Sequence, residues 1–443
     1  IARAGQALRS DRAKGRDVAH RTVRSEYQRL TERLNRFPQG APPSDLLHAI
    51  LKMLFSEREA GLVAQLPVRP FTATRAAQVW KLPLAETIGI LEELASRAIL
   101  LDIQHPDGER VFVLPPPMAG FFEFSMMRIR DDIDQKVLGE LFYQYLNVEE
   151  DFVKALFTDG QTQLGRVFVQ EAVLPVDNGI HVLDYERASE VIHSASSRAV
   201  GLCYCRHKME HVGRACAAPR DICMTFNGTA SSLARNGFAR EVDVAEGLDL
   251  LAEAQEANLV QFGENIQQGV NFICNCCGCC CEAMIASRRF AFMGPVHTAN
   301  WLPVVDAEQC SGCIRCTDAC PVEAMSLTSA NDTRQPRRKR AKVDENLCLG
   351  CGVCARTCRR DAIRLVPRPE RVITPVDSSQ RAVLMAIERG TLQHLIFDNN
   401  ALASHRMMAT ILGVILKAPP VKQALASSQI QSRYVNRVLA RRA

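Results

Sequence analysis

No run of about 18 consecutive apolar residues, the length that a membrane-spanning helix needs, occurs in this sequence of 443 residues. The apolar stretch of a secretory signal peptide is missing as well. The sequence also lacks a glycine-rich dinucleotide fingerprint (G-x-G-x-x-G), a phosphate-binding P-loop and the spacing of a nucleophile triad. These absences predict a chain without transmembrane segments. They also count against an independent enzyme, so we assign no catalytic residue.

A strong excess of one charge sign is missing too. The chain has 54 Lys and Arg against 49 Asp and Glu, a net charge of +5, which gives no general case for binding nucleic acid. Its hydrophobic fraction of 47% is ordinary for globular proteins and sufficient for several cores. The length therefore predicts a chain of several domains.

Cysteine, in contrast, is abundant. All 18 cysteines lie between residues 203 and 358, in closely spaced runs. Secreted disulfide proteins are cysteine-rich as well, but runs of this spacing are typical of metal ligands. Closely spaced free thiols would be hazardous in an oxidising compartment, so we expect the reducing cytoplasm.

The clearest run is C-x2-C-x2-C-x3-C, which occurs twice, at 310–320 and 348–358. Bacterial ferredoxins bind two 4Fe–4S clusters with this motif, in which three thiolates bind one cluster and the fourth serves the other. Zinc sites use two C-x2-C pairs instead, so the third cysteine of each run favours clusters. This predicts two crossed ligand sets: Cys310, Cys313, Cys316 and Cys358 for one cluster, and Cys348, Cys351, Cys354 and Cys320 for the other.

An earlier group has the pattern C-x-C-x10-C-x6-C and consists of Cys203, Cys205, Cys216 and Cys223. Four thiolates can hold a cubane cluster or a zinc ion. The ferredoxin runs nearby favour a cluster. Three basic residues either offset its negative charge or lie at the surface: Arg206, His207 and Arg214.

Six cysteines fill eight positions of another group: Cys274, Cys276, Cys277, Cys279, Cys280 and Cys281. One segment cannot bury six neighbouring side chains in the same direction, so metal binding is the better interpretation. A cubane needs four ligands, which leaves two spare, structural or part of an unusual cluster. Side-chain alternation favours Cys274, Cys276 and one of Cys279 or Cys280 pointing together. A single cluster shared with the preceding group is an open alternative. In total we expect three to four 4Fe–4S clusters.

The pattern of residues 44–118 resembles a winged-helix domain. Helices are expected at 45–57, 72–80 and 85–97, the last with Ile88, Leu91 and Leu94 inward, and a hairpin at 99–114 around a His-Pro-Asp-Gly turn. A DNA-reading helix presents basic or amide side chains to the bases. The third helix instead carries acidic residues, which favours docking to a protein: Glu86, Glu92 and Glu93.

The whole chain is expected to be a multidomain α+β protein. Its parts, in order, are a basic N-terminal arm (1–43), the winged-helix-like domain (44–118), a mixed α/β segment (119–200), a Cys-rich metal-binding region (201–300), a dicluster ferredoxin domain (301–370) and a helical tail (371–443). A basic run at 334–342 separates the ferredoxin motifs. It predicts either a docking face for an acidic redox partner or a merely solvated loop.

The combination of motifs resembles a family of multicluster, ferredoxin-domain proteins of anaerobic and facultative bacteria. The motifs that carry this resemblance are the two ferredoxin runs, the CYCR sequence at 203–206, the CAAP sequence at 216–219 and the NCC sequence at 275–277. The resemblance implies an iron–sulfur electron-transfer subunit with a redox partner or a larger oxidoreductase complex. Two alternatives remain: a redox-responsive winged-helix transcription regulator, and a reductase that binds its substrate at an unusual cluster.

Overall fold

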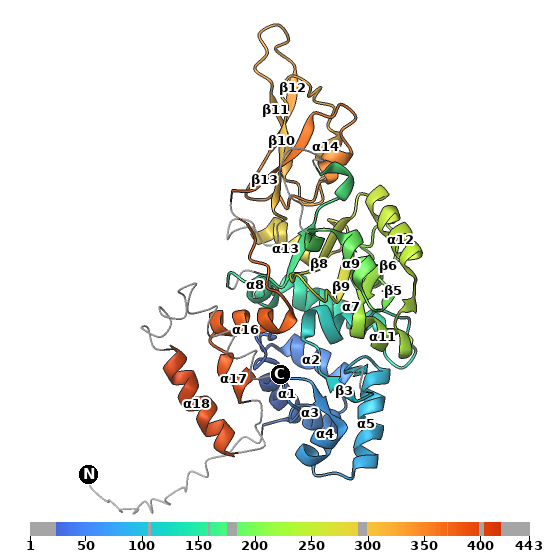
Figure 1. The fold of residues 1–443 in the computed structure, drawn as a ribbon, viewed down its shortest axis with the longest axis vertical. Coiled ribbons are helices and arrows are strands. Elements are labelled where there is room, and N and C mark those ends of the chain that lie inside the picture. Colours follow the sequence, from blue (N-terminus) through green and yellow to red (C-terminus); the bar gives the residue numbers. More distant parts are fainter. Residues whose placement is uncertain are drawn as a thin grey trace, which may run out of the picture.

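The computed structural model describes residues 24–104, 108–157, 160–174, 184–290, 299–369, 371–397 and 403–417. Figure 1 shows an elongated molecule, with a helical N-terminal part at one end, a β-sheet in the middle and a narrow arm at the other end. The turn expected at 105–108 falls mostly outside the described residues. The part of the expected helical tail beyond residue 417 falls outside them entirely.

The N-terminal part contains five helices and a small antiparallel sheet with the order β1-β3-β2. Its elements are α1 (Glu26–Leu34), α2 (Asp45–Leu54), α3 (Glu57–Val63), β1 (Phe71–Thr72), α4 (Ala73–Trp80), α5 (Leu84–Ser96), β2 (Leu101–Gln104) and β3 (Arg110–Val113). Serine and threonine side chains begin four of the helices, since Ser25, Ser44, Ser56 and Thr72 each accept a backbone N–H bond.

Two expectations for this part need correction. The helix expected at 45–57 ends at Leu54, because Phe55 is extended and Ser56 starts a separate helix, α3. Ile88 was expected inside but is exposed, because Leu91 and Leu94 define the buried stripe of α5 together with Thr87.

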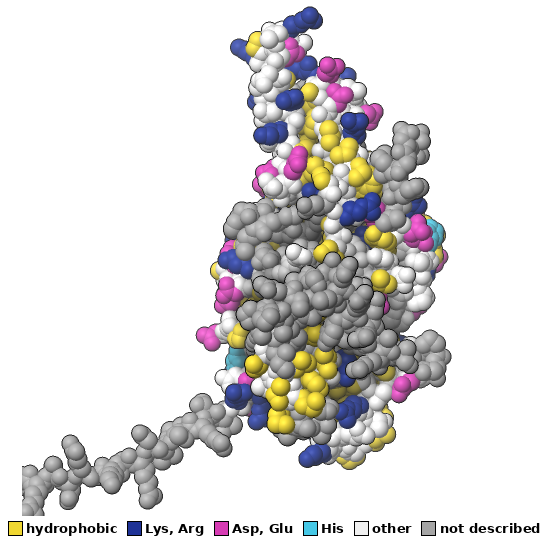
Figure 2. Space-filling view, turned by 60° about the vertical axis from the view of Figure 1, so that its left-hand side comes forward, with side chains coloured by type: hydrophobic (Ala, Val, Ile, Leu, Met, Phe, Trp, Pro, Cys, Tyr) yellow, Lys and Arg dark blue, Asp and Glu magenta, His cyan; other side chains and the backbone are white. Residues whose placement is uncertain are grey.

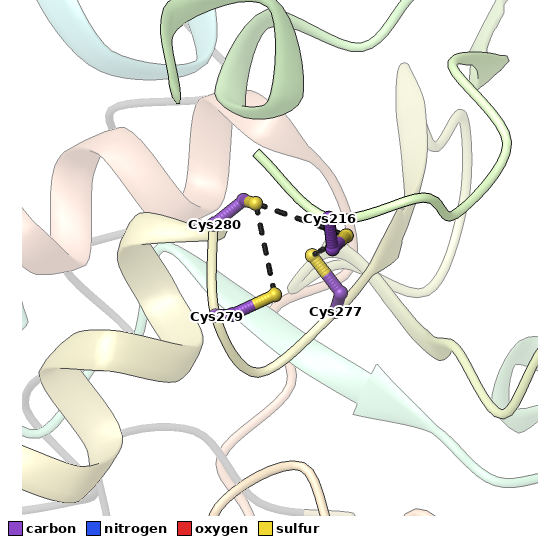
Figure 3. Close-up of side chains that lie close together, drawn as sticks. All are labelled: Cys216, Cys277, Cys279 and Cys280. Atoms are coloured by element: carbon purple, nitrogen blue, oxygen red, sulfur yellow. Dashed lines mark hydrogen bonds between the residues drawn. The ribbon is translucent and has the colours of Figure 1, made fainter. Parts of the chain in front are cut away.

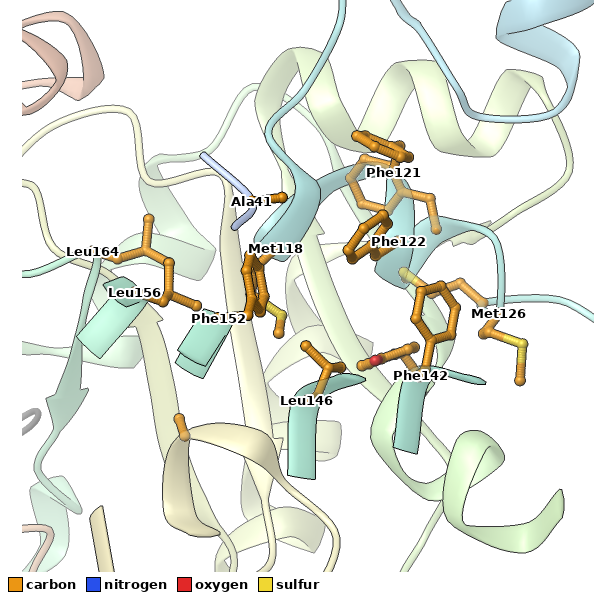
Figure 4. Packing of buried hydrophobic residues seen from close by; sticks show 14 of the residues in the cluster. Ala41, Met118, Phe121, Phe122, Met126, Phe142, Leu146, Phe152, Leu156 and Leu164 are labelled. Atoms are coloured by element: carbon orange, nitrogen blue, oxygen red, sulfur yellow. The ribbon is translucent and has the colours of Figure 1, made fainter. Parts of the chain in front are cut away.

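An aromatic core joins the N-terminal part to the sheet. It lies in the segment formed by η1 (Pro117–Phe121), α6 (Phe122–Phe124), α7 (Gln135–Tyr143), η2 (Gln144–Val148) and α8 (Asp151–Phe157). Figure 4 shows Phe122, Phe142 and Phe152 packed together, with the Phe122 and Phe142 ring centres 5.1 Å apart. Aromatic rings bury large apolar areas, so this cluster stabilises the packing of the N-terminal part against the cysteine-rich sheet.

The middle of the molecule is a six-stranded antiparallel sheet with the order β4-β8-β9-β6-β5-β7. Its strands are β4 (Gly165–Phe168), β5 (Arg198–Leu202), β6 (Asp221–Phe226), β7 (Arg240–Glu241), β8 (Val260–Glu264) and β9 (Phe272–Cys276). The accompanying helices are η3 (Glu171–Val173), η4 (Asp184–Glu186), α9 (Ala188–Ser194), α10 (Tyr204–His211), α11 (Asn227–Arg235), α12 (Val244–Glu256) and α13 (Glu282–Phe290).

The expected boundary between a mixed segment and a Cys-rich region at residue 200 falls inside β5. The two stretches share one sheet, because β4 pairs with β8 and β5 pairs with β6 across that boundary. Strand pairing between residues far apart in sequence produces this unit.

The arm is built from two antiparallel strand pairs and two one-turn helices. Its elements are β10 (Trp301–Val305), α14 (Arg315–Asp318), β11 (Met325–Ser329), β12 (Lys339–Val343), α15 (Val353–Arg356) and β13 (Ile363–Pro367). β10 pairs with β13, and β11 pairs with β12. The β11–β12 hairpin forms the tip of the arm in Figure 1.

Three helices follow the arm and return to the N-terminal end: α16 (Ser378–Glu388), α17 (Leu392–Ile396) and α18 (Ala403–Lys417). Glu388 anchors α16 by accepting a 2.7 Å bond from the Thr162 hydroxyl. In Figure 2, hydrophobic side chains gather on the lower part of the face that carries α18, whose exposed apolar residues are Met407, Met408, Ile411 and Val414. None of the described helices is long and apolar enough to cross a membrane.

Candidate metal centres

The two ferredoxin runs form matching loops in the arm. Each loop contains two residues with left-handed backbone conformation, Gly312 and Ile314 (φ +67° for both) in the first and Gly350 and Gly352 (φ +72° and +87°) in the second. Left-handed residues in such a loop turn backbone N–H groups inward, which creates an anion-binding concavity. Each loop then enters its one-turn helix, α14 or α15.

Backbone N–H groups already point at ferredoxin thiols. The N–H of Ala341 donates to Cys310 Sγ at 3.4 Å, and the N–H of Gly350 donates to Cys348 Sγ at 3.4 Å. Cys320 Sγ accepts from the N–H of Ala324 at 3.2 Å. Such bonds stabilise thiolate ligands and tune cluster potentials, so the donor set fits 4Fe–4S clusters.

The fourth cysteine of each run lies with the other run. Cys358 lines one small cavity together with Cys310, Cys313 and Cys316. On the other side, burial raises the pKa of Cys348 to about 11, and the neighbouring Cys320 thiolate is among the charges that add to the rise. The crossed ligand sets expected from the motif stay a prediction. The two sets differ in access, because Cys313 is exposed whereas Cys348 and Cys354 are buried.

The ten upstream cysteines form two sites on the sheet, and each site draws on both sequence groups. The first, which we call the six-thiol ring, consists of Cys203, Cys205, Cys223, Cys274, Cys276 and Cys281. Neighbouring thiols around it shift one another's pKa: Cys203 with Cys205 and Cys223, Cys274 with Cys223 and Cys276, and Cys281 with Cys205 and Cys276. The distance from Cys281 Sγ to Cys276 Sγ is 3.1 Å.

A cavity of about 310 Å³ lies against the ring, and all six of its cysteines line that cavity. Most of the other lining side chains are apolar and come from the N-terminal part, the sheet and α16. Glu123 lines the cavity too. Its pKa lies well above the usual range because of burial and, next, the Cys274 thiolate. The hydroxyl of buried Tyr204, another lining residue, has no hydrogen-bond partner within the part of the chain that the structure describes.

The second site, which we call the four-thiol group, consists of Cys216, Cys277, Cys279 and Cys280 (Figure 3). Its sulfurs are 3.6 Å apart for Cys216 and Cys277, 3.7 Å for Cys279 and Cys280, and 3.9 Å for Cys280 and Cys216. A bond from Cys280, and then the charge of Arg206, lowers the pKa of Cys277 to about 5. Cys279 is exposed, whereas Cys280 is buried.

This partition corrects the expected grouping. Cys274 and Cys276 do lie together, because they alternate along β9. Cys279 and Cys280 lie with Cys216 instead, because the chain leaves the strand after Cys276 and turns at Gly278. Alternation applies only within a strand, and the end of β9 was not evident from a run of six cysteines.

Arg206 is buried between the two sites. Its guanidinium donates to the carbonyls of Pro219 at 2.8 Å and Asn275 at 3.0 Å. Burial alone would lower the pKa of Arg206, but the thiolates of Cys203 and Cys277 outweigh it, so the pKa is raised. Arg206 therefore offsets the thiolate charge.

The other two basic residues singled out in the sequence have different surroundings. His207 is buried and bonds to the carbonyl of Met126 at 2.7 Å. Arg214 contacts the hydroxyl of Tyr143 near the surface. Sequence inspection missed a buried ion pair between Lys208 and Glu282, which joins the helix after Cys203 to the helix after Cys281. Their wide separation in sequence gave no signal for it.

The loop of the four-thiol group also meets the arm. Arg288 of α13 donates to the carbonyl of Pro321 at 3.3 Å and forms an ion pair with Glu323 at 3.4 Å. Pro321 directly follows Cys320. Helix α13 and the loop that follows Cys320 are therefore in contact.

Comparison with known proteins agrees with the arm's geometry. A family model described as a 4Fe-4S dicluster domain matches residues 309–362. The ferredoxin-type protein NapF of Escherichia coli K12 is 31% identical over 122 residues, which cover 26% of this chain and 71% of NapF. The indolepyruvate oxidoreductase subunit IorA of Pyrococcus abyssi is 28% identical over 135 residues, 29% of this chain and 19% of IorA.

The NADH-quinone oxidoreductase subunit I of Pelobacter propionicus gives a shorter match, with 33% identity over 61 residues. These residues cover 13% of this chain and 33% of that subunit. No solved structure matches significantly. The chain thus spans about a fifth of IorA and a third of subunit I, but most of NapF. The two ferredoxin loops and these matches show that the chain belongs to the ferredoxin-type iron–sulfur proteins with a 4Fe–4S dicluster domain. It binds multiple 4Fe–4S clusters.

Proposed function

We propose that this chain is an electron-transfer subunit that relays single electrons between a redox partner at the arm and the six-thiol ring of the sheet. The observation that carries the proposal is the difference in access between the two ferredoxin sets, since the outer set contains an exposed cysteine, Cys313, whereas the inner set contains none and lies closer to the sheet. When bound, each cluster takes up or releases one electron. The chain supplies the cysteine ligands and donates backbone N–H bonds to their sulfurs. It also excludes water from the cysteines of the inner ferredoxin set.

The ligands we propose for the outer cluster are Cys310, Cys313, Cys316 and Cys358, and those for the inner cluster are Cys348, Cys351, Cys354 and Cys320. The common cavity of the outer set supports this assignment. So does the proximity of Cys320 to Cys348 and Cys351. The six-thiol ring is the proposed site of a further cluster, because it gathers six thiols, four of them buried, and a cubane needs four.

The tip of the arm is the docking surface that we propose for an acidic redox partner. Arg334, Arg337 and Lys339 are exposed on the β11–β12 hairpin. Arg338 instead ties the hairpin to the outer loop, since it pairs with Asp332 at 3.1 Å and donates to the carbonyl of Cys310 at 3.2 Å. Exposed positive charge beside the outer cluster would steer an acidic partner to it.

A tagged chain purified anaerobically from its native cells tests this function. We expect an oxidoreductase to co-purify and to exchange electrons with the chain, measured as reversible bleaching of cluster absorption. Replacing Arg334, Arg337 and Lys339 with glutamate should slow this exchange at low salt. The difference in exchange rate from the wild type should vanish at about 0.5 M salt. The control is Lys136→Glu on α7, away from the arm. Equal exchange rates for all three proteins at low salt would contradict docking at the tip.

For the N-terminal part, we propose a winged-helix-like domain that docks to protein rather than to DNA. The wing strand β2 is already engaged within the chain, because buried Asp102 accepts bonds from Ser232 and Arg235 of α11. On α5, Glu86 pairs with Arg58, and Glu92 with Arg110. Contacts to phosphate dominate DNA affinity, whereas this surface presents acidic side chains that are paired with arginines. A selection on random duplexes should therefore enrich no defined sequence; enrichment would favour the regulator.

The cavity beside the six-thiol ring favours a second candidate, a reductase that binds a small apolar substrate there. Its lining is mainly apolar but also contains polar and charged groups, among them Glu123, Arg206, Glu264 and the Tyr204 hydroxyl, which has no partner among the described residues. Apolar pockets with a few polar groups are typical ligand sites. Crystals pressurised with xenon test access, since dry apolar cavities bind it. Xenon density beside the ring would support a substrate site, and its absence would leave the relay alone.

A further inference from the structure

The sulfurs of the four-thiol group lie at the spacing of ligands to a single metal ion. Zinc binds thiolate sulfur at about 2.3 Å in tetrahedral geometry, and the edges of such a tetrahedron are about 3.8 Å long. The three sulfur distances described above, 3.6, 3.7 and 3.9 Å, cluster around this value. All four sulfurs lie within 4.8 Å of one another.

A cubane cluster does not fit these four thiols. Its ligands bind four different irons and point away from the cluster centre, so their sulfurs must be spread well beyond the edge of a single-ion tetrahedron. The arm provides an internal comparison. Among the described residues, the four-thiol group is the one set of three or more metal-binding side chains whose ligand atoms lie all within 4.8 Å. The ferredoxin cysteines, which fit clusters, are more widely spread.

We propose that Cys216, Cys277, Cys279 and Cys280 bind one tetrahedral Zn²⁺ ion. Four thiolates close the coordination sphere, which is typical of structural zinc sites rather than catalytic ones. Zinc does not change its oxidation state, so the site adds no step to an electron relay. The inference is independent of the proposed function, because it rests only on the sulfur geometry.

The ion would fasten two segments that carry ligands of the six-thiol ring. Cys216 lies in the loop between α10 and β6, and the other three ligands lie in the turn between β9 and α13. Cys276 and Cys281 directly flank that turn and belong to the ring. Arg206, which bonds to Pro219 and Asn275 on the two segments, offsets the negative charge of four thiolates around a divalent ion. The zinc site would thus fix the relative positions of the cysteines in the six-thiol ring.

Metal analysis of the anaerobically purified chain tests the inference. We expect about one zinc per chain, with X-ray absorption at the zinc edge showing four sulfurs at about 2.3 Å and no neighbouring metal. Cys279→Ser should lose the zinc and keep its iron. The matched control is Cys313→Ser, which changes the other exposed cysteine and should lose iron while keeping zinc.

Two outcomes would overturn the proposal. One is a zinc-free wild-type chain whose Cys279→Ser variant loses about four irons, the content of one cubane. The other is zinc bound through nitrogen or oxygen ligands in the wild-type chain. The absorption spectrum of the wild-type protein decides the question even where Cys279→Ser fails to fold.

Discussion

Gly278 of the four-thiol loop packs directly against Pro321 of the arm. A β-carbon at position 278 would lie 2.2 Å from the carbonyl oxygen of Pro321, far inside van der Waals contact. The neighbours of Gly278 are Cys277 and Cys279, and Pro321 follows Cys320. A residue without a side chain therefore brings the metal-binding loops of the sheet and the arm together.

Gly278→Ala should push these loops apart, because the obstructing atom belongs to the backbone of Pro321 and cannot rotate away. We expect faster hydrogen–deuterium exchange in both loops, at 277–281 and 320–323, with the metal content unchanged. Gly89→Ala is the control: Gly89 lies in α5 with nothing within 4 Å of its added β-carbon. That change should stabilise the helix by about 0.5–1 kcal/mol. Unaltered exchange in Gly278→Ala would mean that the contact does not hold the two parts together.

Crossed ligation predicts which cluster each single substitution damages. Cys320→Ser should remove or alter the inner cluster, although Cys320 belongs to the first run by sequence. Cys358→Ser is the reciprocal variant and should damage the outer cluster. Electron paramagnetic resonance of the reduced proteins distinguishes the two. The assignment fails if each substitution affects the cluster of its own run.

Iron content follows from the proposed distribution of sites. Two clusters in the arm and one at the six-thiol ring give about 12 iron atoms per chain, counting four per cubane. Iron and acid-labile sulfide should be present in similar amounts. A value near 8 would mean that the ring holds no cluster, whereas about 16 would place a cluster at the four-thiol group.

Asp102 connects the wing to the sheet. Its carboxylate, which is fully buried, accepts bonds from Ser232 at 2.6 Å, Arg235 at 2.6 Å and Arg110 at 2.7 Å. Asp102→Asn should weaken this contact by about 3 kcal/mol, since it removes the charged acceptor of the bonds from Arg110 and Arg235. Amides of β2 would then exchange on the order of 100-fold faster. The control is Glu246→Gln, which breaks an exposed pair with Arg240 and should cost less than about 1 kcal/mol.

The same carboxylate sets a pH dependence. Burial alone would raise the pKa of Asp102, but the bonds from Ser232, Arg110 and Arg235 outweigh it and hold the pKa below its usual 3.8. A lowered pKa in the folded state adds stability above pH 3.8, and this is lost as the pH falls through the lower, folded value. The exchange difference between wild type and Asp102→Asn should therefore stay constant from about pH 7 to pH 5. A difference that shrinks within that range would contradict a lowered pKa.

The sequence alone determined the local features. Two C-x2-C-x2-C-x3-C runs specify the cluster loops, because three thiolates and the turns between them lie within seven residues. Helices with strong caps were also predictable: α4 begins after Thr72 and α12 after Asp243, as the residue types favour. In these cases the interacting groups are close neighbours along the chain.

Only the tertiary structure decided how the ten upstream cysteines divide between two sites. Cys216 lies 61 residues before Cys277 yet within 3.6 Å of it, because β6 and β9 pair in the sheet. Cys281 likewise lies 76 residues after Cys205 yet meets it in the ring, where the buried contact of Lys208 with Glu282 joins the two helices that follow Cys203 and Cys281. Spacing along the chain identifies thiols as ligands, but the pairing of distant strands determines which of them share a metal.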